Sequence, residues 1–166
     1  MARRRRHPSL VPLSHDHRDA LGLAFRLRHP APPGPVTAMT PASTPASRAA
    51  ETLAFWDRHL VGHFAAEETL LFPFLRTHLA DAAPLLDALV AEHRTLAARR
   101  DAVATAADAG GPALDAALLA FGEELERHVR REERELFEHF PDVAADDGQR
   151  LADAIREALP PRPATR

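Results

Sequence analysis

Two segments with the same spacing lie far apart in the chain: His63-Phe64-Ala65-Ala66-Glu67-Glu68 and His128-Val129-Arg130-Arg131-Glu132-Glu133. In each segment a histidine precedes a glutamate by four residues. On an α-helix this spacing puts both side chains on one face, one turn apart. Apolar residues around the first segment, among them Leu60 and Leu71, also recur at helical spacing. Each segment is therefore predicted to lie on a helix that has one apolar face.

Proline and glycine divide the rest of the chain into helical runs at about residues 13–29, 47–79, 84–108 and 112–140. A weaker run at 146–159 is compatible with a short fifth C-terminal helix. Because the later connections are short, the predicted fold is all-α, an up-down-up-down four-helix bundle. Ser14 is the candidate N-cap of the first helix. Pro73 is expected to kink or loosen the second helix near Thr69.

The length of 166 residues fits one domain. Residues 1–12 are predicted to form a disordered basic N-terminal tail, and residues 13–145 the bundle, with a Pro-rich linker at 30–46. Residues 146–166 are expected to form the short C-terminal helix and a tail. The hydrophobic fraction of 45% consists mostly of Ala and Leu, and Tyr is absent. This composition favours helix over sheet.

Charge and composition exclude several classes of function. The net charge of −3 lacks the basic excess of a dedicated nucleic-acid binder. The chain has no Cys, which excludes disulfides, cysteine catalysis and thiolate metal sites. No apolar run has the length of a signal peptide or a membrane span, so no membrane association is expected and a cytoplasmic location is compatible. Nucleophile-elbow, phosphate-loop and dinucleotide motifs are also lacking.

Two further histidines complete a set of six candidate metal ligands. His17 lies on the first helical run and His93 on the third, so each of the four runs offers a histidine. With a rise of ~1.5 Å per residue, His93 and His128 are expected at nearly the same height in the bundle, and Glu67 within ~4.5 Å of that of His93. Unpaired imidazoles and carboxylates would destabilise a core, whereas a pair of cations removes that penalty. Imidazole and carboxylate together suit iron, manganese or zinc.

One such motif alone would be compatible with a polar surface, but the set of six favours a metal site. His17 is preferred over His15 as the ligand of the first helix, because it shares a helix face with apolar residues. His59 precedes His63 by one turn and could be a ligand, a gate or a hydrogen-bond donor to a ligand, of which the last is favoured. Four acidic residues adjoin the candidate ligands, and most are expected to face solvent or form ion pairs: Asp16, Glu68, Glu92 and Glu133.

Taken together, these blocks resemble the hemerythrin-like, or HHE cation-binding, family, in its bacterial type. The matching blocks are His59–Glu68 with Leu71-Phe72-Pro73, then Glu92-His93-Arg94, then His128–Arg134. The resemblance implies a non-haem centre of two iron ions, bridged by carboxylates and an oxo or hydroxo group. The ligands that it implies, position by position, are His17, His63, Glu67, His93, His128 and Glu132.

The chain differs from the oxygen-carrying members of that family at two ligand positions. Ala97 stands where their third helix has a second histidine, and Glu132 follows His128 by four residues where they have an Asp at the fifth. The expected function is therefore to bind or react with a small molecule, namely O2, NO or peroxide. The alternatives are an iron- or oxygen-sensing module that acts on a protein partner, and a zinc-loaded or metal-free structural bundle.

Overall fold

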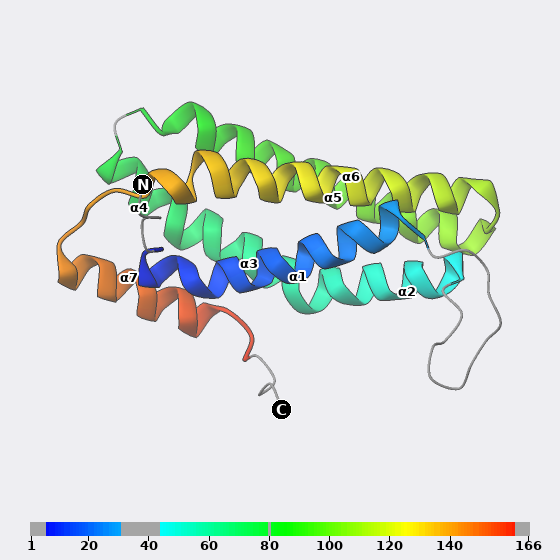
Figure 1. The fold of residues 1–166 in the computed structure, drawn as a ribbon, viewed down its shortest axis with the longest axis horizontal. Coiled ribbons are helices and arrows are strands. Elements are labelled where there is room, and N and C mark those ends of the chain that lie inside the picture. Colours follow the sequence, from blue (N-terminus) through cyan, green and yellow to red (C-terminus); the bar gives the residue numbers. More distant parts are fainter. Residues whose placement is uncertain (1–5, 31–43, 80, 162–166) are drawn as a thin grey trace.

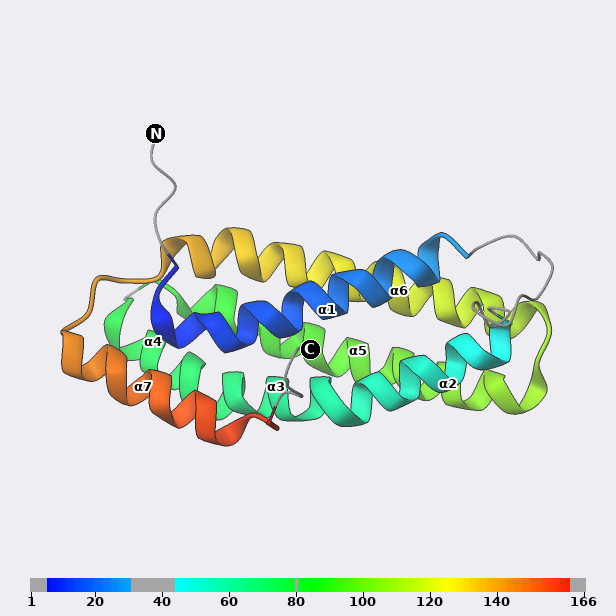
Figure 2. The ribbon, with the colours of Figure 1, turned by 60° about the horizontal axis from the view of Figure 1, so that its bottom comes forward.

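The computed structural model describes residues 6–30, 44–79 and 81–161, and all regular structure in these ranges is helical. Three long helices, α1 (Val11–Arg28), α5 (Ala83–Ala109) and α6 (Pro112–Glu135), form three rods of a bundle (Figure 1). The fourth rod is the composite segment from Pro45 to His78. Successive rods run in opposite directions (Figure 2). The predicted up-down-up-down all-α fold is confirmed.

The composite rod alternates between α-helix and wider π-helical turns. It consists of α2 (Pro45–Phe55), η2 (Trp56–Leu60), α3 (Val61–Ala66), η3 (Glu67–Leu71) and α4 (Phe72–His78). Pro73 cannot donate a backbone hydrogen bond to the Thr69 carbonyl, and Thr69 lies inside the π-helical turn η3. The predicted loosening near Thr69 is therefore confirmed. Turns of this kind are frequent at functional sites.

The first helix begins earlier than the sequence predicted. A 3-10 turn, η1 (Pro8–Leu10), leads directly into α1, and Leu10 is fully buried. Pro12 fits the first turn of α1, where a missing N–H is tolerated. The proposed N-cap at Ser14 is wrong, since Ser14 lies inside the helix and its hydroxyl accepts a hydrogen bond from Arg6. The expectation of a disordered tail thus does not hold for η1 and the start of α1, while residues 1–5 lie outside the described residues.

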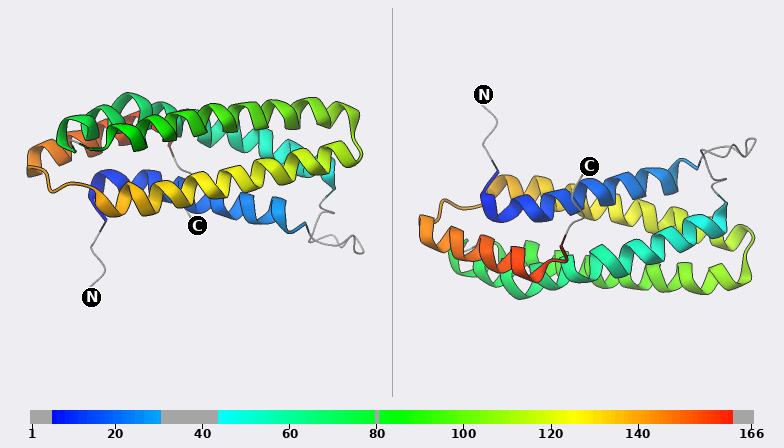
Figure 3. Two further views of the ribbon diagram at one scale, coloured as in Figure 1. Left: turned by 90° about the horizontal axis from the view of Figure 1, so that it is seen from above. Right: turned by 90° about the horizontal axis from the view of Figure 1, so that it is seen from below.

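The C-terminal part of the chain closes one end of the bundle. Helix α6 ends at Glu135, before the predicted limit, and continues as the 3-10 turn η4 (Phe137–His139). Pro141 then keeps Phe140 extended. The weak fifth run is confirmed as α7 (Ala145–Ala158), which packs against η1 and η3 (Figure 3). Most of the predicted linker, residues 31–43, lies outside the described residues.

Glycine permits the tight turn between α5 and α6 and the close approach of α6 to α1. Gly110 and Gly111 have φ angles of 66° and 70°, which L-residues rarely adopt, and they make the tight turn between α5 and α6. Gly122 lets α6 approach α1, because a Cβ at this position would lie 3.0 Å from the Leu27 Cβ and 3.2 Å from the Ala24 carbonyl oxygen.

The interior of the bundle is divided into two apolar clusters. One contains Leu23, Trp56 and Phe121, and the other contains Leu13 and Leu86. Between them lie the buried polar side chains of His17, His63, Glu67, His93, His128 and Glu132. The described part of the chain contains no helix that is both long and apolar enough to cross a membrane.

Candidate metal centre

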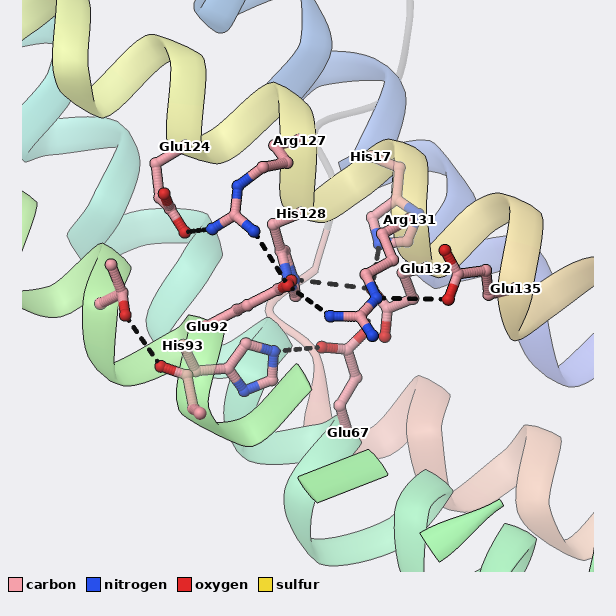
Figure 4. Close-up of polar contacts among 12 residues, drawn as sticks. His17, Glu67, Glu92, His93, Glu124, Arg127, His128, Arg131, Glu132 and Glu135 are labelled. Atoms are coloured by element: carbon pink, nitrogen blue, oxygen red, sulfur yellow. Dashed lines mark hydrogen bonds and ion pairs between the residues drawn. The ribbon is translucent and has the colours of Figure 1, made fainter. Parts of the chain in front are cut away.

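The six predicted ligands meet between the two apolar clusters, and they form two donor groups that share one residue. Figure 4 shows His17, Glu67, His93, His128 and Glu132. The first group is His17, His63, Glu67 and Glu132; the second is Glu67, His93 and His128. Within each group, one nitrogen or oxygen atom from every residue lies within 4.8 Å of the others. Glu67 belongs to both groups, so its carboxylate links them.

The Glu67 carboxylate lies between histidines of two different rods. Its Oε1 atom is 2.9 Å from the His63 Nε2 atom, one helical turn away. Its Oε2 atom is 3.4 Å from the His93 Nε2 atom on α5. Each oxygen therefore faces a different histidine, which is the arrangement that a bridging carboxylate requires.

The Glu132 carboxylate occupies the corresponding place on α6. Its Oε2 atom is 3.1 Å from the His17 Nε2 atom and 3.7 Å from the His128 Nε2 atom. The Nε2 atoms of His17 and His63 also face each other at 3.1 Å. All four histidines thus turn Nε2 toward the two glutamates.

Several of these buried atoms lack a well-aligned hydrogen bond. In the described part of the chain, they include both carboxylate oxygens of Glu67 and of Glu132 and the Nε2 atoms of His93 and His128. All six side chains are at most 4% exposed, so water cannot readily solvate them. Buried polar atoms without partners are strongly destabilising. Nitrogen and carboxylate donors directed at one region fit metal ions of the iron, manganese or zinc class.

The charges of the metal-free site shift the pKa values of its groups. Burial by itself would lower the pKa of His63, but the adjacent charge of Glu67, aided by Asp16, raises it to about 10. Burial would raise the pKa of Glu67, but the neighbouring His63 and His93 hold it well below its usual range. Hydrogen bonds to glutamates likewise outweigh burial and raise the pKa values of His17 and His93. Protons therefore partly balance the buried carboxylates when no metal is bound.

The four acidic residues adjacent to the predicted ligands were expected mostly to face solvent or to form ion pairs, and all four form ion pairs. Each bonds the Nδ1 atom of a donor-group histidine on another rod. The Nδ1–oxygen pairs are His17–Glu133 at 2.7 Å, His63–Asp16 at 3.3 Å, His93–Glu68 at 2.7 Å and His128–Glu92 at 2.9 Å. Sequence reasoning did not identify these partners because it followed each acid around its own helix only. On every rod a predicted ligand is adjacent in sequence to an acidic residue, and this regularity could have indicated that the acids have a common role.

The four carboxylates that bond Nδ1 atoms lie outside the two donor groups and are called the outer carboxylates below. Arginines hold two of them in the ionised form. Arg131 and Arg127 bond Glu92 at 2.8 and 3.3 Å (Figure 4). Burial would raise the pKa of Glu92, but bonds to His128 and Arg131 lower it to about 2. Arg6 bonds the Glu133 Oε1 atom at 2.8 Å.

Two other histidines of the sequence analysis lie outside both donor groups. His15 is exposed on α1, whereas His17 is 3% exposed and faces the centre. The His59 ring packs on Phe55, with 4.8 Å between the ring centroids. The favoured interpretation of His59 as a hydrogen-bond donor to a ligand finds no support in this contact.

Comparison with known proteins agrees with this arrangement. Residues 10–140 match the model of the hemerythrin HHE cation binding domain, and this range contains all four rods and η4. A search of curated proteins and a search of solved structures found no match. The family match covers well over half of the chain and contains every residue of the two donor groups. The chain therefore belongs to the hemerythrin HHE cation-binding family.

Proposed function

We propose that the two donor groups hold a pair of iron ions, and that the centre binds or reacts with O2, NO or peroxide. The ligands in this proposal are His17, His63, Glu67, His93, His128 and Glu132. The observation that carries it is the position of Glu67, whose two oxygens face histidines of both groups. A carboxylate shared in this way supports a paired centre better than two independent sites. When bound, iron would supply redox chemistry and exchangeable coordination positions.

The protein's own part is to arrange the donors and to keep water away from them. Phe64 stacks on His93 with ring centroids 4.0 Å apart and meets His128 edge-on at 5.6 Å. Phe137 stacks on His17 at 5.0 Å. These apolar rings limit the room around the centre and lower its local polarity. Such surroundings favour small ligands, such as diatomic molecules and peroxide, over larger ones.

Metal content and absorption together test the proposal. Protein purified aerobically with iron supplied is expected to contain two iron ions per chain by elemental analysis. The ferric form should show near-ultraviolet bands that change when azide, NO or peroxide is added. The iron should also cycle between the ferrous and ferric states.

Two results would contradict different parts of the proposal. One metal ion or none per chain, even after reconstitution with iron, would contradict the paired centre. A paired centre whose spectrum ignores all three ligands, and whose iron does not cycle, would contradict the small-molecule function. In that case an iron-sensing or structural role would be the better account.

A further inference from the structure

The outer carboxylates have a regular arrangement around the bundle. Asp16 of α1 bonds His63 of α3, and Glu68 of η3 bonds His93 of α5. Continuing in the same direction, Glu92 of α5 bonds His128 of α6, and Glu133 of α6 bonds His17 of α1. The four contacts therefore form a closed ring, in which every rod supplies one carboxylate and receives one on its histidine.

Each carboxylate of this ring is adjacent in sequence to an inner donor of its own rod. The adjacent pairs are Asp16–His17, Glu67–Glu68, Glu92–His93 and Glu132–Glu133. Neighbouring residues on a helix point ~100° apart. One side chain of each pair can therefore face the bundle axis while the other reaches the next rod.

We propose that Asp16, Glu68, Glu92 and Glu133 are positioning residues that orient the histidines of the next rod toward the metal pair. The proposal rests on the proposed function, which supplies the metal. An ionised carboxylate can only accept a hydrogen bond, so the bonded Nδ1 must carry a proton. In a neutral imidazole this leaves Nε2 as the lone-pair donor, and Nε2 is the atom that faces Glu67 or Glu132 in all four histidines.

The ring also explains interactions that lie outside the two donor groups. Glu92 is 6% exposed and would be poorly placed without Arg127 and Arg131, which bond it from α6. Arg6 does the same for Glu133, and its guanidinium also lies 5.4 Å from the Phe137 ring. Arg6, which lies before η1, therefore helps to hold the carboxylate that bonds His17.

The direction of the ring gives a test that ordinary destabilisation would not mimic. Glu68→Gln is the main variant, because Glu68 is 40% exposed and its loss should disturb the fold little. An amide can donate as well as accept, so it no longer requires a proton on Nδ1. The affected histidine should be His93 on the next rod. Glu133→Gln should affect His17 instead, and Glu123→Gln, exposed on α6, is the control.

The measurement is ¹⁵N and ¹H NMR of the histidine rings, without metal and with Zn²⁺ as a diamagnetic probe. In Glu68→Gln the Nδ1–H signal of His93 should shift or broaden, while the other ligand histidines and the Glu123→Gln control keep theirs. Affinity for Zn²⁺ and Fe²⁺, measured against a competing chelator, should fall by about 10–100-fold. Circular dichroism should show an unchanged helical content.

The outcomes separate the ring from the proposed function. An unchanged His93 signal in Glu68→Gln, or a change confined to residues of its own rod, would overturn the positioning role. Affinity within about twofold of the control would do the same, provided the parent protein binds metal. A parent protein that binds no metal would overturn the proposed function, and the metal-free NMR result would still decide whether Glu68 bonds the His93 Nδ1–H group.

Discussion

Replacing Glu67 by Gln is predicted to remove more bound iron than replacing a single histidine. Glu67 belongs to both donor groups, so its loss reduces groups of four and three donors to three and two. His93→Ala leaves the first group complete and shortens only the second. We therefore expect about two iron ions per chain in the parent protein, about one in His93→Ala and less than one in Glu67→Gln.

The size of the effect follows from charge and distance. The donor atoms of each group lie within 4.8 Å of one another. Unit charges about 4 Å apart interact by about 4 kcal/mol at an effective dielectric constant near 20. Removing one negative charge should thus weaken iron binding by about a thousandfold, since about 1.4 kcal/mol corresponds to a factor of ten. Gln has nearly the volume of Glu, so the fully buried position stays filled.

Elemental analysis after iron reconstitution, with chelator competition for affinity, provides the assay. Circular dichroism establishes that Glu67→Gln is folded. His59→Ala is the control, because His59 packs on Phe55 outside both donor groups and should keep its iron. A folded Glu67→Gln protein that retains both iron ions, with affinity within tenfold of the parent, would refute the shared carboxylate.

Three further predictions concern the ligand choice, protonation and packing. His17→Ala should lose iron and His15→Ala should keep it, because only His17 belongs to a donor group; equal iron contents by elemental analysis would contradict this. Burial would lower the pKa of His63, but the Glu67 charge outweighs it and raises this pKa from 6.5 to about 10. The ion pair of protonated His63 should therefore contribute fully to the stability of the metal-free protein below pH 6.5, and this contribution should be lost as the pH rises to about 10. Iron should displace this proton, so its affinity should increase as the pH rises across the same interval. Calorimetry in buffers of different ionisation enthalpy can measure the proton release, and iron binding without proton release would contradict the prediction. Gly122→Ala should lower the free energy of unfolding by about 1–3 kcal/mol, since its Cβ would meet α1 at 3.0 Å. The matched Gly22→Ala, whose Cβ would lie 3.5 Å from a flexible Arg26 side chain, should raise it by about 0.5–1 kcal/mol in denaturant unfolding.

The sequence alone was sufficient for the approximate helical runs and for the inner faces of the site. Proline and glycine mark where helices stop, and a spacing of four puts His63 with Glu67 and His128 with Glu132 on common faces. Counting residues from the helix ends also predicted that His93 lies at the height of Glu67 and His128 along the bundle, and the three share a donor group. These properties depend on the backbone geometry of single helices, which local sequence largely determines. The start of α1 was misjudged because Ser14 was taken as the N-cap, whereas the helix begins at Val11 and accepts Pro12 in its first turn.

Contacts between rods were decided by the tertiary structure. Nothing in the periodicity of α5 indicates that Glu92 bonds His128, because that contact depends on how α5 and α6 are rotated and how closely they approach. The same holds for Arg6, which reaches Glu133 of α6 through the packing of the neighbouring η1 against α7 and α1. Sequence spacing assigns a side chain to a face of its own helix. Which atom it meets across the interface is set by the packing of the whole bundle, and the ring of outer carboxylates exists only at that level.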